Sequence, residues 1–119
     1  MLLTISTTLH TQSQSSDPHV RIARLVIDSA QLEAYKAALK EEIAAAVKAE
    51  PGVLRMYAVY DKVHPDQVTV FETYASREAY DQHIQTPHFK KYKSGTLSMV
   101  RSLELADVVP IIFEAKKDQ

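Results

Sequence analysis

The chain has 119 residues, carries a net charge of −1 and contains no cysteine. This length suits a single domain. The lack of cysteine excludes disulfides, thiolate nucleophiles and cysteine-ligated metal clusters. The balanced charge offers no basic field for nucleic acid or for an anionic membrane, so neither is an expected partner. The two glycines are too few for a phosphate-binding loop or a dinucleotide-binding motif.

The first 18 residues are predicted to form a flexible arm, because residues 11–18 are polar, lack periodicity and end in Pro18. The domain is expected over residues 19–113, followed by a frayed tail at 114–119. The opening residues are mildly apolar but have no basic region, so we expect a cytoplasmic protein. A periplasmic location is the alternative if the arm is the remnant of a signal peptide.

Residues 19–28 form the first predicted strand, because β-favouring side chains dominate and Asp28-Ser29 stops the run. Asp28 and Gln31 resemble a capping box, which indicates the start of a helix. Apolar residues then recur at three- and four-residue steps over residues 31–50, and Pro51-Gly52 follows. This spacing predicts a long helix with one apolar face.

Two strands at residues 53–60 and 67–74 are predicted to form a hairpin around the loop 61–66. The strand at residues 53–60 carries apolar residues on both of its faces. These are Leu54, Met56, Ala58 and Tyr60 on one face, and Val53, Tyr57 and Val59 on the other. A sheet that is apolar on both faces needs a cover. We therefore predict a symmetric homodimer in which two sheets pack together. The alternative is that one set consists of ordinary surface residues.

Ser76 is expected to cap a helix over residues 77–85, and Thr86-Pro87 to end it and start another. A last strand is predicted at residues 103–109, and residues 111–113 either pair again or reach a partner. The order β-α-β-β-α-β is the split βαβ pattern of a ferredoxin-like α+β fold. It places helices on one face of an antiparallel sheet, and two such sheets would pack into a dimeric α+β barrel.

His83 and Glu72 are the candidate catalytic residues. His83 shares a helix face with Tyr80, and Glu72 shares a strand face with Val70 and Tyr74. A histidine bonded to a carboxylate can act as a general base near neutral pH. The alternatives are a structural or surface histidine, and a glutamate that bonds the backbone or an arginine of a second subunit.

A metal site built from His83, His88 and Glu72 is not expected, because the spacing matches no ligand motif and Pro87 interrupts the helix between the two histidines. His88 lies near a helix N-terminus, where the neutral imidazole is favoured. A structural role is expected for it. No Ser-His-Asp set can be identified, since the chain has no nucleophile elbow.

Four motifs follow one another along the chain: Glu50-Pro51-Gly52, Glu72-Thr73-Tyr74, the stretch from Glu78 to His83, and Thr86-Pro87-His88-Phe89. Together they resemble the antibiotic biosynthesis monooxygenase family over residues 20–112, closest to its quinol monooxygenase branch. The resemblance implies a dimeric α+β barrel with a pocket between sheet and helices. It also implies oxidation of a small quinol or phenol by dioxygen without metal, flavin or haem, in which the protein supplies a base, a dry cavity and orientation.

The matched positions make His83 the implied base and Glu72 its orienting or acidic partner. The implied substrate-binding residues are Phe71, Tyr74, Tyr80, His88, Phe89, Tyr92, Met99 and Arg24. The chain has neither Trp nor Asn, which counts against haem degradation and removes the usual tryptophan of polyketide oxygenases. Two alternatives stay open. One is an isomerase or lyase that uses the same pair on a small carbonyl or phosphorylated substrate, with the lysines of residues 90–93 as phosphate ligands. The other is a non-catalytic barrel that binds a small ligand.

Overall fold

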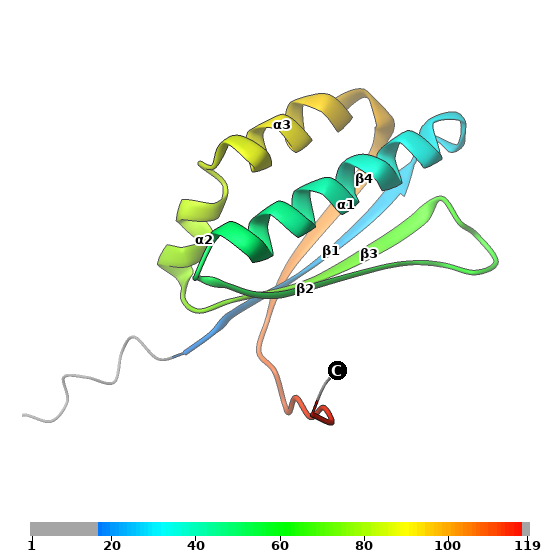
Figure 1. Cartoon of the computed structure of the whole chain (residues 1–119). Coiled ribbons are helices and arrows are strands. Elements are labelled where there is room, and N and C mark those ends of the chain that lie inside the picture. Colours follow the sequence, from blue (N-terminus) through cyan, green and yellow to red (C-terminus); the bar gives the residue numbers. More distant parts are fainter. Residues whose placement is uncertain (1–16, 118–119) are drawn as a thin grey trace, which may run out of the picture.

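The computed structural model describes residues 17–117 and has one antiparallel sheet with helices on one face (Figure 1). The strand order is β2-β3-β1-β4. The ferredoxin-like α+β fold predicted from the sequence is thereby confirmed. The elements are β1 (His19–Ile27), η2 (Ser29–Gln31), α1 (Leu32–Ala49), β2 (Val53–Tyr60), β3 (Gln67–Tyr74), α2 (Arg77–His83), α3 (Pro87–Thr96), η3 (Leu97–Met99) and β4 (Val100–Val108).

Most of the predicted arm, residues 1–16, lies outside the described residues. In the part of the chain that the structure describes, no helix is both long enough and apolar enough to cross a membrane.

The starts of α1 and β4 differ from the sequence prediction. The Asp28 carboxylate accepts a hydrogen bond from the Ala30 amide at 3.2 Å. The Gln31 side chain donates to the same carboxylate and to the Ser98 carbonyl, and the Asp28 amide that a capping box would bond to Gln31 donates to Met99 instead. The first turn is therefore the short 3-10 helix η2, and α1 begins at Leu32. At the other end, β4 begins at Val100, three residues earlier than predicted, and residues 111–113 are exposed and form no strand.

The main core lies between the sheet and α1. Strand alternation turns every second residue of β1 and β3 towards the helices. The buried members of this cluster are Ala23, Leu25, Ile27, Tyr35, Leu39, Val68 and Val70. Burying one large aliphatic side chain of this kind contributes roughly 1.5–3 kcal/mol relative to leaving it exposed. The core therefore fixes the position of α1 on the sheet and its distance from the strands.

A β-bulge near the start of β2 changes which side chains face the helices. Val53 pairs with Tyr74, whereas Arg55 pairs with the adjacent Thr73, so Leu54 is an additional residue. Val53 is consequently buried on the helix side and Leu54 is exposed. The prediction that grouped Val53 with Tyr57 and Val59 was wrong, because a bulge shifts the alternation by one residue.

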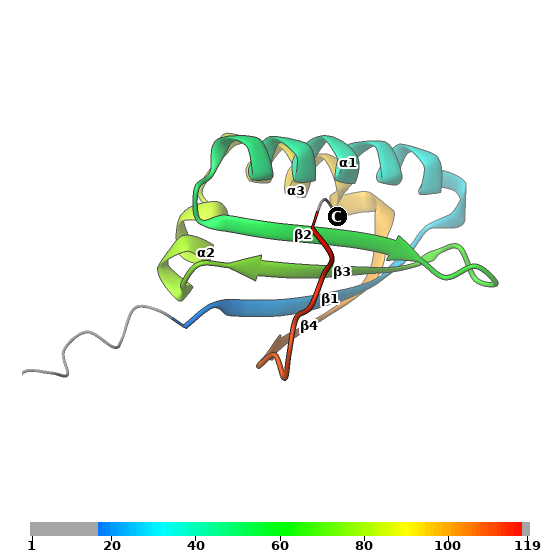
Figure 2. The ribbon, with the colours of Figure 1, turned by 60° about the horizontal axis from the view of Figure 1, so that its bottom comes forward.

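The helix-free face of the sheet still carries exposed apolar side chains. Tyr57 and Phe71 are 66% and 42% exposed, and their ring centres lie 6.4 Å apart. The chain after β4 turns below this face (Figures 1 and 2), where the Arg55 guanidinium carbon lies 3.9 Å from the ring centre of Phe113. Both faces of the sheet are thus apolar, although the cover of the second face stays a prediction.

Gly52 is expected to tolerate no side chain, because a Cβ there would lie 2.6 Å from the Cβ of Ala79 in α2. We predict that Gly52→Ala lowers the free energy of unfolding by about 1–3 kcal/mol, as overpacking does elsewhere. Gly95→Ala in α3 is the matched control, since a Cβ at that position would meet nothing within 4 Å, and it should be neutral or stabilising by up to about 1 kcal/mol. Urea unfolding of both variants measures the difference, and equal stabilities would contradict the prediction.

Candidate functional site

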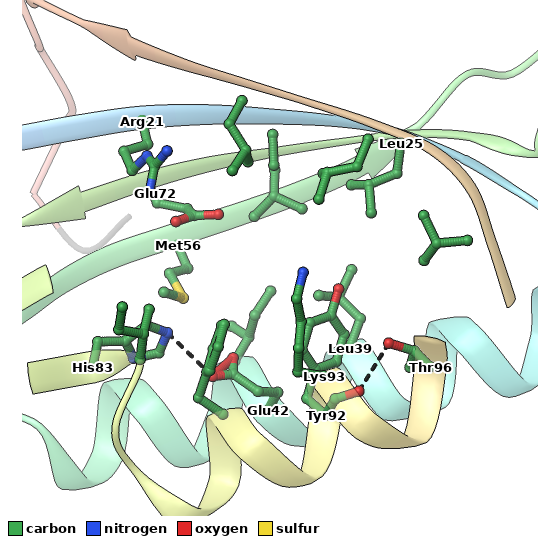
Figure 3. Close-up of a pocket in the computed structure, with 18 of the residues that line it drawn as sticks. Arg21, Leu25, Leu39, Glu42, Met56, Glu72, His83, Tyr92, Lys93 and Thr96 are labelled. Atoms are coloured by element: carbon green, nitrogen blue, oxygen red, sulfur yellow. Dashed lines mark hydrogen bonds and ion pairs between the residues drawn. The ribbon is translucent and has the colours of Figure 1, made fainter. Parts of the chain in front are cut away.

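A cavity of about 660 Å³ lies between the sheet and the helices (Figure 3). Its volume is within the range of sites that enclose a small organic molecule. The walls are mainly apolar and include Ala23, Leu25, Leu39, Val70, Phe89 and Tyr92. Arg21, Glu42, Glu72 and His83 supply polar groups at one end (Figure 3). Along β4 the wall is open, because Leu103 and Leu105 are partly exposed.

His83 ends α2 and is only 2% exposed. Its Nδ1 lies 2.9 Å from Oε2 of Glu50, the residue that caps the C-terminus of α1. The same Glu50 oxygen forms a short contact with Nε2 of His88 at the start of α3. On its other side, Nε2 of His83 lies 3.3 Å from Oε2 of Glu42. The ring is therefore held between two carboxylates, both contributed by α1 and its cap.

The break between α2 and α3 brings the two histidines to this point. The Ser76 hydroxyl accepts from the Ala79 amide and begins α2, and the Thr86 hydroxyl accepts from the Phe89 amide and begins α3. Both caps are as the sequence predicted. Thr86 also donates to the His83 carbonyl at 2.7 Å. This turn places the ring centres of His83 and His88 6.2 Å apart.

Glu72 faces the cavity beside Val70 and Tyr74, as strand alternation predicted. Its Oε1 accepts a hydrogen bond from the Tyr74 hydroxyl at 2.7 Å. Burial raises the pKa of Glu72 above its ordinary value, and the Tyr74 hydrogen bond opposes this shift in part. The carboxylate bonded to His83 is thus Glu50, whereas Glu72 is bonded to a tyrosine.

Glu42 is a site residue that the sequence reasoning missed. It is 4% exposed, and burial raises the pKa of its carboxyl, while the nearby His83 and His88 lower it in part. Its Oε2 has no hydrogen-bond partner among residues 17–117. A signal was available, because Glu42 falls in the buried helical register of Tyr35, Leu39 and Ala46. A charged residue in such a register needs a partner.

The structure separates the predicted substrate-binding residues into two groups. Tyr74, Tyr80, Phe89 and Tyr92 line the cavity. Phe71 and Arg24 lie on the helix-free face, because they alternate with the cavity-facing neighbours Val70, Glu72, Ala23 and Leu25.

The two remaining predicted residues also lie outside the main cavity. His88 contacts Glu50 and lines a smaller adjacent cavity, and Met99 packs against the core. Sequence reasoning missed Arg21, which lines the main cavity. Its guanidinium carbon lies 4.5 Å from the ring centre of Tyr80, and its Nε lies 3.0 Å from Oδ1 of Asp107.

The sheet, its helices and the polar-ended cavity between them define a small domain of ferredoxin-like topology. The family model for antibiotic biosynthesis monooxygenases matches residues 18–94, and the chain belongs to this family. Among curated proteins, no match to the chain is found.

Solved structures agree with this assignment. A protein of Bacteroides thetaiotaomicron, named as a candidate antibiotic biosynthesis monooxygenase, is 52% identical with a TM-score of 0.81, over 86% of this chain and 97% of that one. A candidate monooxygenase of Lactobacillus acidophilus is 31% identical with a TM-score of 0.77, over 79% of this chain and 45% of that one. A Pseudomonas aeruginosa protein shares the fold at 20% identity, with a TM-score of 0.75 over 83% of this chain and 99% of that one.

The raised pKa of Glu72 predicts a specific pH dependence of stability. Because the folded state favours the protonated carboxyl, its contribution is complete below the unfolded-state pKa near 4.5 and is lost as the pH rises through the higher folded-state pKa. Glu72→Gln keeps an oxygen for Tyr74 but removes the ionisation. We expect the variant to melt several degrees higher than the wild type at pH 8 and to differ little at pH 4. Thermal unfolding across this range checks it. The control is Glu104→Gln on an exposed part of β4, and parallel curves for wild type and Glu72→Gln would contradict the prediction.

Proposed function

We propose that the protein is a monooxygenase that oxidises a small quinol or phenol with dioxygen, without metal, flavin or haem. The observation that carries the proposal is the buried His83 at the polar end of an apolar cavity, with Glu50 bonded to its Nδ1. Membership of the family and the 52% identical relative named as a candidate monooxygenase support the reaction class.

The proposed reaction begins with proton transfer to His83. Glu50 accepts a hydrogen bond from Nδ1–H of the neutral ring, which leaves Nε2 as the acceptor for a substrate hydroxyl proton. The resulting phenolate or quinolate is more easily oxidised and gives one electron to dioxygen, and the two radicals combine to form a carbon–oxygen bond. Loss of water then leaves the quinone, so that one oxygen atom enters the product and the other departs as water. The apolar walls exclude solvent from the reactive intermediates.

The Glu72–Tyr74 pair is assigned to substrate orientation. Burial is the main cause that raises the pKa of Tyr74, and the neighbouring Glu72 raises it further. The Tyr74 hydroxyl therefore keeps its proton and donates to the Glu72 carboxyl. A substrate hydroxyl can bond the second oxygen of Glu72 while the ring lies against the apolar wall. In this proposal Glu50 supports the proton-accepting His83, whereas Glu72 orients the substrate.

An isomerase or lyase is the second candidate, because Arg21, Lys93 and Arg101 also line the cavity and suit an anionic substrate. Of the other lysines considered from the sequence, Lys91 pairs with Glu41 at 2.6 Å and Lys90 is exposed. Turnover of a phosphorylated or carboxylated carbonyl compound without consumption of oxygen would favour this candidate over the oxygenase.

The oxygenase proposal predicts oxygen consumption by metal-free protein with at least one member of a hydroquinone panel. His83→Ala should lower the rate by about 100-fold or more, as loss of a general base does. His64→Ala, in the exposed β2–β3 loop, is the matched control and should keep the wild-type rate. If no quinol is oxidised above background the oxygenase proposal fails, and an unchanged rate in His83→Ala refutes the role of the histidine alone.

We also propose that two copies pack through the helix-free face of the sheet. The exposed rings of Tyr57 and Phe71 on this face, with Val59 beside them, support the assembly. Light scattering should give twice the 13.4 kDa chain mass, and a monomer would refute the proposal. Phe71→Glu should shift the wild-type dimer to monomer. Val63→Glu changes an apolar residue that is 76% exposed in the β2–β3 loop and should leave the dimer intact.

A further inference from the structure

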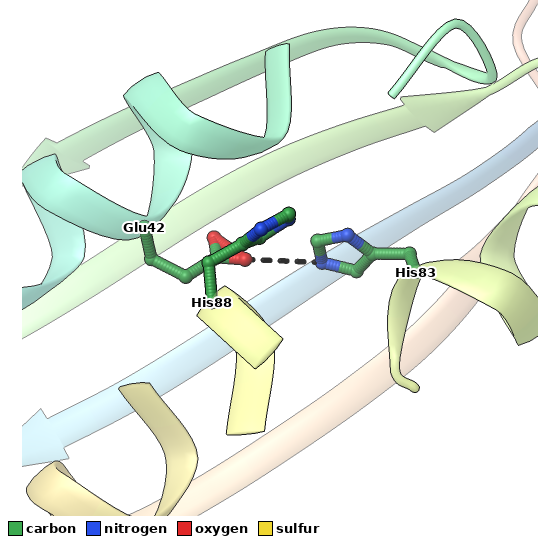
Figure 4. Close-up of side chains that lie close together, drawn as sticks. All are labelled: Glu42, His83 and His88. Atoms are coloured by element: carbon green, nitrogen blue, oxygen red, sulfur yellow. Dashed lines mark ion pairs between the residues drawn. The ribbon is translucent and has the colours of Figure 1, made fainter. Parts of the chain in front are cut away.

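The junction of α1, α2 and α3 gathers two glutamates and two histidines within contact distance. Figure 4 shows three of them, Glu42, His83 and His88. We propose that Glu42, His83 and His88 bind a divalent transition-metal ion, and that Glu50 orients both imidazole rings from outside the ligand set. This site is distinct in chemistry from the oxygenase proposed above, which uses no metal.

The spacing of the three residues fits a metal ion. One ligand atom from each residue lies within 4.8 Å of the other two. In a tetrahedral zinc site with bonds of about 2.0–2.1 Å, neighbouring ligand atoms are about 3.3 Å apart. Oε2 of Glu42 and Nε2 of His83 already have this separation of 3.3 Å. His88, whose side chain is less buried than that of His83, supplies the third ligand atom within the 4.8 Å limit.

Glu50 sets the tautomers that a metal needs. One of its oxygens contacts Nδ1 of His83 and Nε2 of His88. A neutral imidazole that donates one N–H keeps a lone pair on the opposite nitrogen, which leaves Nε2 of His83 and Nδ1 of His88 as ligands. Metal-bound histidines commonly donate their second N–H to a carboxylate in this way. The nitrogen of His83 freed by this arrangement is the one that faces Glu42.

Glu42 provides an independent reason for a cation. Its side chain is buried, and Oε2 has no hydrogen-bond partner among the described residues. The two nearby histidines compensate an ionised carboxylate only in part at such a buried position, and a metal ion on Oε2 supplies a full opposite charge. Two imidazoles in the set favour zinc or a neighbouring first-row metal over calcium or magnesium, which prefer oxygen ligands.

A metal was not expected from the sequence, because Glu72 was the assumed carboxylate and Pro87 interrupts the helix. The structure replaces Glu72 with Glu42 and shows that the interruption turns His88 back towards His83. Glu42 and His83 also line the main cavity. A fourth ligand on the metal, water or a bound molecule, would therefore face that cavity, as in sites that keep one position open.

If the proposed oxygenase function holds, metal binding should inhibit the reaction, and this one expectation rests on the proposed function. The metal uses the lone pair of His83 that would accept the substrate proton. Zinc at saturation is therefore expected to inhibit oxygen consumption, and removal of zinc by a chelator to restore it. Zinc binding is measured without any substrate, so a failure of the metal-site proposal can be distinguished from a failure of the oxygenase proposal.

Titration calorimetry of the full chain, stripped with chelator, tests the site. We expect one Zn²⁺ per chain, no competition from excess Mg²⁺, and an affinity at least about 10-fold weaker in Glu42→Gln, in His88→Gln and, through ring orientation, in Glu50→Gln. Two matched controls should bind as the wild type does: Glu72→Gln, a cavity carboxyl outside the set, and His64→Gln, an exposed loop histidine.

Absence of zinc binding, or full affinity in both Glu42→Gln and His88→Gln, would overturn the proposal. The Co²⁺ complex of the wild type gives a second readout that needs no variant, should any of them fail to fold. A four- or five-coordinate nitrogen and oxygen site gives intense visible absorption. If the spectrum shows only the weak bands of octahedral cobalt, as a hydrated ion at the protein surface would give, the proposed site is also overturned.

Discussion

The hydrogen bond between Glu50 and His83 is the contact on which the arrangement of the site depends. It joins the C-terminal cap of α1 to the end of α2, and the same glutamate oxygen reaches His88 at the start of α3. Three helices packed on one face of a sheet are thereby fixed relative to one another at one end of the cavity. A histidine as buried as His83 would be costly without such partners. The bond thus sets both the position of the ring and the nitrogen that remains free.

Local patterns predicted the elements well because each depends on a few neighbouring residues. The register of α1, the caps at Ser76 and Thr86, and the strands β2 and β3 needed only periodicity and capping chemistry. The bulge at Leu54 could not be predicted in this way, since it is defined by pairing with β3. The prediction for the face of Val53 was wrong for that reason.

The candidate site was harder to predict than the fold. His83, Tyr74, Tyr80, Phe89 and Tyr92 reach the cavity because strand alternation and helix faces are local properties. The contacts that define the chemistry join residues far apart in the chain, as Glu50 and His83 are, and only packing shows them. In the sequence, the Glu50-Pro51-Gly52 motif indicated only the end of a helix, and nothing local pointed to a contact between Glu50 and His83. The buried register of Glu42 was a signal that could have been used.

Three glutamates near His83 have different hydrogen-bond partners. Glu50 is committed to two histidines, and Glu72 to the Tyr74 hydroxyl, whereas one oxygen of Glu42 has no hydrogen bond among residues 17–117. Burial raises the pKa of both Glu42 and Glu72, so each is more readily neutral than a surface glutamate. A protonated Glu42 can donate to Nε2 of His83 and occupy its lone pair, whereas an ionised Glu42 leaves that lone pair to a substrate proton or, together with the carboxylate, to a metal ion. The protonation state of one buried carboxyl thus determines whether Nε2 is available, while the Glu50 hydrogen bond holds the His83 ring in the same place in both cases.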